Sequence, residues 1–110
     1  MVNEHTAEGL TQELRRGTLV LSVLSQLKEP QYGYSLVQGL GKKGLVIEQN
    51  TLYPLLRRLE KQQLLESDWE VTGTRPRRYY KLSEKGHDML KCLTEEWNKL
   101  AGVVSKLLDT

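Results

Sequence analysis

The chain has 110 residues, of which 38% are hydrophobic and 27% are charged, and its formal net charge is +2. This length predicts a single domain, and the composition is too apolar for a disordered chain. No apolar run is long enough to cross a bilayer or to act as a signal peptide, so we expect no membrane partner. One cysteine excludes an internal disulfide and fits a reducing compartment, and with two histidines it leaves too few ligands for a zinc finger. We therefore expect a cytoplasmic protein without a metal site or a cofactor.

The excess positive charge is concentrated in one short segment. Residues 72–82 contain Arg75, Arg77, Arg78 and Lys81 and no acidic residue, whereas the rest of the chain has slightly more acidic than basic residues. Such a segment is typical of a surface that binds an anionic partner. The alternative is that these arginines only keep an exposed hairpin from pairing edge to edge with another chain.

Two helices are predicted in the first part of the chain. Apolar residues recur at intervals of three and four over residues 10–27, which predicts one helix with a broad buried face. This helix should end before Pro30, because the residue preceding a proline avoids helical dihedral angles. A short second helix begins at residues 32–34 and should be ended by Gly41 and Gly44. Residues 45–47 are too few for a helix and predict a brief extended piece.

The predicted third helix has an apolar face and a basic face. Asn50 is a good N-cap for a helix over residues 51–62, in which Pro54 is tolerated in the first turn. The apolar face consists of Leu52, Leu55, Leu56 and Leu59, and the opposite face consists of Asn50, Pro54, Arg57 and Lys61, flanked by Tyr53 and Arg58. The basic face is either a solvated surface or a surface that binds anions.

The basic segment belongs to a predicted β-hairpin, with strands over residues 64–71 and 77–82 and a turn that contains Gly73 and Pro76. Arginine guanidinium groups match phosphate oxygens and also fit a narrow minor groove. Three helices followed by such a hairpin are the plan of a winged helix-turn-helix. In that plan the third helix enters the major groove, and the hairpin, or wing, contacts the neighbouring phosphates.

A long last helix begins after Ser83, which is a good N-cap, and runs to about Leu108. Its apolar positions alternate in steps of four and three, as in a heptad repeat: Gly86, Leu90, Leu93, Trp97, Leu100, Val104 and Leu107. The pattern predicts a partner helix, most simply the same helix of a second subunit, with packing inside the chain as the alternative. We expect the dimer interface to contain Leu90, Leu93, Trp97, Leu100, Val104 and Leu107. Trp97 either fills the interface or lines a gap in which a planar aromatic molecule could stack.

The sequence contains no arrangement that favours catalysis. His87 and Cys92 are five residues apart, so on a helix they lie on different faces. Glu95 and Glu96 are adjacent and are not opposed across a site. We therefore expect no catalytic residues and no enzymatic activity.

Three segments of the sequence resemble the PadR family, the regulators named for phenolic acid decarboxylase control. They are Tyr32-Gly33-Tyr34-Ser35-Leu36, the block from Asn50 to Lys61, and the block from Arg77 to Gly86. Their order and spacing match as well, and the resemblance extends from about Leu14 to the end of the chain. One departure is Gln63, which stands where a glycine is common and should alter the turn into the wing.

The resemblance implies a homodimeric bacterial transcriptional regulator, usually a repressor, that binds a pseudo-palindromic operator. It implies that residues 50–61 are the recognition helix, that Tyr53 contacts phosphate, and that a single C-terminal helix forms the dimer. Family members that bind planar drugs or phenolic acids at the dimer interface make Trp97 a candidate ligand-binding residue.

The overall expectation is a mainly α fold with a small β-hairpin. Residues 10–82 form a winged helix-turn-helix, and residues 83–110 form the dimerisation helix. The partners are double-stranded DNA and a second copy of the chain, and a planar aromatic molecule is a further candidate. The alternative is a winged-helix module that binds protein and not DNA. The expected DNA-binding residues are Asn50, Thr51, Tyr53, Pro54, Arg57, Arg58, Lys61, Arg75, Arg77 and Arg78.

Overall fold

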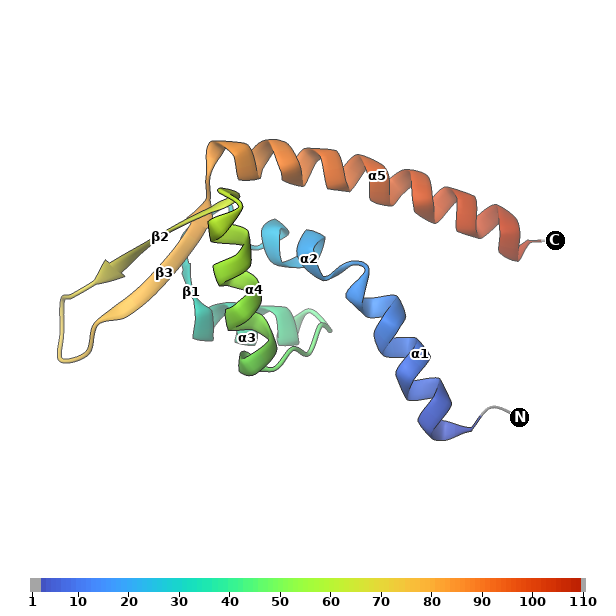
Figure 1. The fold of residues 1–110 in the computed structure, drawn as a ribbon, viewed down its shortest axis with the longest axis horizontal. Helices are drawn as coiled ribbons and strands as arrows, with labels where there is room; N and C mark the ends of the chain where they lie inside the picture. Colours follow the sequence, from blue (N-terminus) through green and yellow to red (C-terminus); the bar gives the residue numbers. More distant parts are fainter. Residues whose placement is uncertain (1–2, 110) are drawn as a thin grey trace.

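The computed structural model describes residues 3–109, and its long axis runs from a β-hairpin at one end to the outer parts of two helices at the other (Figure 1). The helices are α1 (Glu4–Arg16), α2 (Leu19–Ser25), α3 (Gly33–Lys42), α4 (Gln49–Lys61) and α5 (Glu84–Leu108), and the strands are β1 (Gln31–Tyr32), β2 (Leu65–Glu70) and β3 (Arg77–Leu82). The mainly helical fold with a small hairpin is the predicted one.

The prediction of one helix over residues 10–27 is wrong, because the chain breaks between α1 and α2. Gly17 ends α1, and the Thr18 hydroxyl donates a hydrogen bond to the Arg15 carbonyl (2.9 Å), a local contact that competes with a continuing helix. Helix α1 buries no side chain, and Leu10 and Leu14 are 60% and 78% exposed. The apolar periodicity continues across the break, so it could not reveal that the two halves lie in different surroundings.

Helix α3 ends in a Schellman turn at Gly44, and Gly41, predicted to help end it, lies inside the helix. Gly44 has a φ of 103°, and the Leu45 N–H donates to the Leu40 carbonyl (2.9 Å). Residues 45–47, predicted as a brief extended piece, belong to no helix and pair with no strand, and Ile47 is buried.

Helix α4 begins at Gln49, with Glu48 as its N-cap residue and no side-chain capping hydrogen bond. The prediction of Asn50 as the N-cap is therefore wrong, and Pro54 lies in the second turn and not in the first. At the other end Gln63 has a φ of 67°, and the Leu64 N–H donates to the Leu59 carbonyl (2.9 Å). This is a second Schellman turn, whose left-handed position favours glycine and is occupied here by Gln63.

The hairpin is confirmed, and β3 lies in the centre of a three-stranded antiparallel sheet of order β1-β3-β2. Strand β1 pairs with β3 over two residues only and was not predicted, because so short a strand leaves no periodicity to recognise. In the hairpin Leu65 pairs with Leu82, Ser67 with Tyr80 and Trp69 with Arg78. Because side chains alternate along a strand, these six share the inner face of the wing, which α4 covers near its base.

Helix α5 is anchored at its first turn and buried only near its beginning. The Ser83 hydroxyl accepts the Gly86 N–H (2.9 Å), as predicted, and donates to the Gln63 carbonyl (2.6 Å). A side chain on Gly86 would collide with the Leu64 carbonyl, so glycine allows α5 to approach the turn after α4. Leu90, predicted to face a second subunit, is 8% exposed and belongs to the core of its own chain.

Candidate nucleic-acid interface

Helix α4 separates its apolar and polar residues as predicted. The four leucines Leu52, Leu55, Leu56 and Leu59 are buried in the core, at 8% exposure or less. The opposite face is exposed and consists of Asn50, Thr51, Pro54, Arg57, Arg58 and Lys61. Among the side-chain ion pairs between residues 3 and 109, none involves the three cations of this face. The helix therefore presents an uncompensated positive surface to solvent.

Tyr53 lies at the edge of this face, and Gly33 at the start of α3 makes its position possible. The ring is half-buried, and a Cβ atom on Gly33 would lie only 2.8 Å from both Cζ and the hydroxyl oxygen of Tyr53. The glycine between Tyr32 and Tyr34 is thus the surface against which the Tyr53 ring rests. This contact aligns α3 with α4.

The wing carries Arg75 and Arg77 on its exposed side. Arg75 lies in the exposed loop between β2 and β3, and the Arg77 guanidinium carbon stands 4.4 Å from the centre of the Tyr32 ring. Tyr32 in turn meets Tyr79 edge to face, with ring centres 6.3 Å apart. Neither arginine forms an ion pair with the described residues. Tyr32 is a site residue that sequence analysis missed, because its role depends on the unpredicted strand β1.

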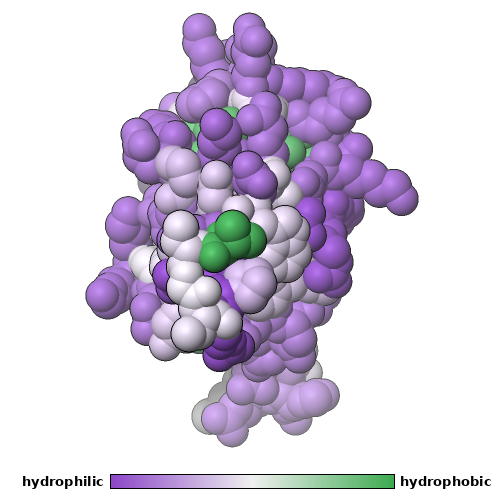
Figure 2. All heavy atoms as spheres, turned by 90° about the vertical axis from the view of Figure 1, so that its left-hand side faces the viewer, coloured by the Kyte–Doolittle hydropathy of each residue, from purple (hydrophilic) through white to green (hydrophobic). Residues whose placement is uncertain are grey.

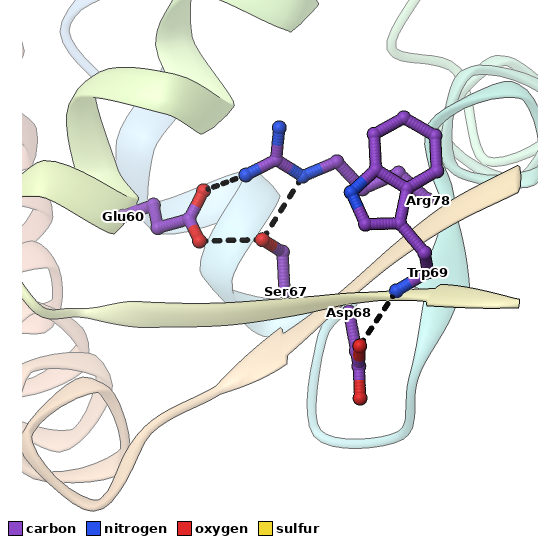
Figure 3. A network of polar contacts seen from close by, with 5 residues as sticks. All are labelled: Glu60, Ser67, Asp68, Trp69 and Arg78. Atoms are coloured by element: carbon purple, nitrogen blue, oxygen red, sulfur yellow. Dashed lines mark hydrogen bonds and ion pairs between the residues drawn. The ribbon is translucent and has the colours of Figure 1, made fainter.

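Arg78 differs from its neighbours, since it points toward α4 and binds both Glu60 and Ser67 (Figure 3). Its guanidinium forms an ion pair with Glu60 of α4 (2.9 Å), and its Nε donates to the Ser67 hydroxyl (3.0 Å). Ser67 donates in turn to the other oxygen of the Glu60 carboxylate. The prediction that the basic segment is unbalanced is therefore wrong for Arg78. Lys81 is also close to an acidic residue, with Glu66 at 3.9 Å.

The rings of Trp69 and Tyr80 flank the Arg78 guanidinium at 5.7 Å and 5.5 Å. Burial raises the pKa of the Tyr80 hydroxyl, and the charge of Arg78 partly opposes this effect. Arg78 and Glu60 keep 36% and 28% of their side-chain surface. The pair is therefore neither fully hydrated nor fully buried.

Near its tip the wing also exposes apolar surface, with Trp69 at 55% and Val71 at 72%. Seen from the wing end, the molecule shows a small hydrophobic area within near-neutral atoms, surrounded by hydrophilic ones (Figure 2). A shallow hollow of about 550 Å³ there is lined by Pro30, Tyr32, Trp69, Val71 and Tyr79, among others.

At the other end of the molecule, α5 leaves most of its predicted interface uncovered. Leu93 is partly buried, whereas Trp97, Leu100, Val104 and Leu107 are between 43% and 66% exposed. Packing inside the chain therefore does not account for the outer half of the heptad pattern. An apolar groove of about 570 Å³ separates this half from the end of α1 and from α2, and its lining includes Leu14, Val20, Leu21, Trp97 and Leu100. The periodicity of residues 10–27 predicts that Leu14 is in the core, whereas it is exposed and lines this groove.

Within residues 3–109 no group of three potential metal-binding side chains occurs, and no helix is long and apolar enough to span a membrane. His87 and Cys92 are both exposed on α5.

Helices α3 and α4 with the β2–β3 hairpin define a winged helix-turn-helix protein. Residues 20–92 match the family described as transcriptional regulator PadR-like, so the chain belongs to the PadR-like family of transcriptional regulators. A padR family regulator from Eggerthella lenta is 50% identical in sequence, with a TM-score of 0.92 over 97% of this chain and 96% of that one. A transcriptional regulator from Mycobacterium tuberculosis is 32% identical over 87% of this chain and 88% of that protein.

A more distant structure, PadR from Bacillus subtilis in complex with operator DNA, has the same fold. It is 20% identical, with a TM-score of 0.65 over 70% of this chain and 45% of that one.

Proposed function

We propose that this protein is a DNA-binding transcriptional regulator that reads a specific sequence in double-stranded DNA and has no enzymatic activity. The observation that carries the proposal is the set of cations on α4 and the wing that form no ion pair within residues 3–109: Arg57, Arg58, Lys61, Arg75 and Arg77. They lie on two neighbouring elements with the geometry of a recognition helix and a wing. The operator complex of the B. subtilis protein of the same fold supports this proposal. Such a regulator acts in the cytoplasm.

In this proposal α4 enters the major groove. Asn50, Thr51, Pro54 and Arg57 lie on the exposed face in the first three turns and would meet base edges. Tyr53, Arg58 and Lys61 lie toward the sides and the end of the helix, where phosphates would be met. Arg75 and Arg77 would contact phosphates or the minor groove beside the site.

We further propose that the protein works as a homodimer, with residues 10–82 as the DNA-binding region and residues 83–110 as the dimerisation helix; Thr110 lies outside the described residues. The exposed stripe from Trp97 to Val104 needs an apolar partner, and a second copy of the same stripe supplies one. The groove beside α1 would receive part of that copy. A two-fold dimer favours a pseudo-palindromic operator, and the family resemblance favours a repressor.

We also propose that a planar aromatic molecule releases the protein from DNA. Trp97 is 45% exposed and lines the apolar groove, where an aromatic ligand could stack on the indole. To act as an inducer, the ligand must bind the DNA-competent and DNA-incompetent dimers with different affinity.

Salt dependence of DNA binding tests the main proposal. If each subunit neutralises about four phosphates, the dimer makes about eight contacts, and the affinity should fall about ten-thousandfold between 50 and 200 mM salt. The probe is a pool of random duplexes, from which repeated selection also yields the preferred sequence. Absence of DNA binding at 50 mM salt, or a DNA affinity that does not change with salt concentration, would instead favour a module that binds protein.

A further inference from the structure

We propose that Glu60 and Arg78 form a clamp that sets the position of the wing relative to the recognition helix, so that Arg78 is a positioning residue and not a DNA contact. The clamp consists of Glu60, Ser67 and Arg78. This inference rests on the proposed DNA-binding function, because the clamp joins the two elements that would bind DNA.

The connectivity of the clamp supports this role. Arg78 of β3 reaches both Glu60 of α4 (2.9 Å) and Ser67 of β2 (3.0 Å), and Ser67 closes the triangle by donating to Glu60 (Figure 3). Three elements thus meet through one guanidinium group, whose planar donors match such a set of acceptors. The Trp69 and Tyr80 rings flank the guanidinium and limit its rotation.

The position of the clamp along the wing is the second observation. On the inner face, Leu65, Tyr80 and Leu82 are buried at the base of the sheet, whereas Trp69, which is level with Arg78, and Val71, which lies beyond it, are largely exposed. Strand β1 pairs only with Tyr79 and Tyr80, close to the base. Among the hydrogen bonds and ion pairs of the described residues, the clamp is the outermost link between the wing and α4, and the arginines of the tip extend beyond it.

The charge of Glu60 is the third observation. A carboxylate in the last turn of a helix opposes the helix dipole, and near DNA it would also repel phosphates. Glu60 is tolerable there because Arg78 compensates its charge. If the Arg78 guanidinium turned away to a phosphate, Glu60 would lose its ion pair beside the DNA and keep only the Ser67 hydroxyl, which favours the positioning role of Arg78.

The test compares Glu60→Gln, Arg78→Gln, Arg78→Lys and the Glu60→Gln/Arg78→Gln double variant in the full-length protein. The probe is the duplex that the wild type selects from a random pool. Glu60→Gln removes a negative charge, so electrostatics alone predicts tighter binding. A clamp predicts weaker binding, by about tenfold, for each single variant and for the double variant alike, because all of them remove the same ion pair. Arg78→Lys should not restore the affinity, since one ammonium group cannot replace the planar fork.

Lys81→Gln is the matched control. It removes a cation from the same strand, but Lys81 is exposed and pairs with Glu66 on the other face of the hairpin.

Hydrogen exchange of the free protein provides a measurement without DNA. Amides of residues 67–70 and 77–80 should exchange faster in Glu60→Gln and in Arg78→Gln than in the wild type and in Lys81→Gln. Failure of the wild type to bind DNA would contradict the proposed function but leave this exchange comparison intact.

Two results would overturn the clamp. One is unchanged exchange in both single variants. The other is the pattern of a phosphate contact, in which Glu60→Gln binds more tightly, Arg78→Lys retains affinity, and Arg78→Gln lowers the salt slope by about 1 per subunit.

Discussion

The ring of Tyr53 rests on Gly33, and no other residue type could occupy the position of Gly33 without displacing it. The contact joins the first residue of α3 to the second turn of α4. It gives a structural reason for the glycine in the Tyr32–Leu36 block, one of the three segments that resemble the PadR family.

Gly33→Ala should therefore displace Tyr53 while leaving most of the core intact. The clash involves the outer end of a side chain that can rotate. We therefore expect a loss of about 1 kcal/mol in the free energy of unfolding, which is at the lower end of the cost of adding atoms to a packed region. Urea denaturation measures this loss. Gly39→Ala, in the same helix with no heavy atom within 4 Å, is the control and should be neutral or slightly stabilising. Equal effects of the two substitutions would show that the Tyr53 contact is not responsible.

Gln63→Gly should stabilise the protein. Gln63 has a φ of 67°, in the left-handed region, where a residue with a side chain is less stable by about 1–2 kcal/mol than glycine is. The greater chain entropy of glycine in the unfolded state offsets part of this gain, which leaves about 0.5–1 kcal/mol. Gly44→Ala, at the equivalent turn after α3, should have the opposite sign. Urea denaturation at one protein concentration measures the change in the free energy of unfolding for each variant. Changes of the same sign in Gln63→Gly and Gly44→Ala would contradict the explanation.

The wing and the recognition helix should make different contributions to DNA binding. Replacing Arg75 and Arg77 with alanine should weaken binding to all duplexes and reduce the salt slope, because phosphate contacts carry no sequence information. Replacing Arg57 with alanine should instead reduce the discrimination between the selected duplex and an unrelated one, by about 1–3 kcal/mol. Titrations of both duplexes at several salt concentrations separate the two effects. An Arg57 variant that loses affinity equally for both would place Arg57 on phosphate.

Leu100→Asp should dissociate the dimer, because it places a charge in an apolar interface. Leu100 suits this test because it is 54% exposed in the single chain, whereas Leu90 belongs to the core and its replacement would unfold the protein. Sedimentation should give twice the chain mass for the wild type and the single mass for the variant. Ser105→Asp adds the same charge on the opposite side of α5 and should remain dimeric. A dimeric Leu100→Asp variant would place the interface elsewhere.

The monomeric variant should also lose specific binding. The two recognition helices of such a dimer contact major grooves about 34 Å apart, and a monomer contacts only one half-site.

Planar aromatic molecules should quench the fluorescence of Trp97 if the groove beside it is a ligand site. Trp69 is a second emitter, at the wing, so the measurement compares Trp69→Phe, in which only Trp97 emits, with Trp97→Leu, in which only Trp69 emits, using a titrated planar dye. Saturable quenching in the first variant, with none in the second, is the expected result. Quenching of Trp69 in the Trp97→Leu single variant would place the site at the wing, and no quenching by any planar compound would make Trp97 a packing residue.

The sequence by itself determined the elements whose signals are local. The leucines of α4, the strand from Arg77 to Leu82 and the cap at Ser83 followed from periodicity, alternation and capping chemistry, all of which act within a few residues. The exposed cations of α4 were predictable for the same reason, since a helix with one leucine face must turn the other toward solvent.

Tertiary structure decided which partner each of these faces meets. Arg75, Arg77 and Arg78 look equivalent in the sequence, yet Arg78 is paired with Glu60, 18 residues away, because the alternation of β3 directs it inward toward α4. One apolar repeat runs from Gly86 to Leu107, but only its beginning is buried, because only that part of α5 lies against the core. A periodic pattern identifies the side of a helix that avoids water, whereas what covers that side depends on contacts between residues distant in the chain.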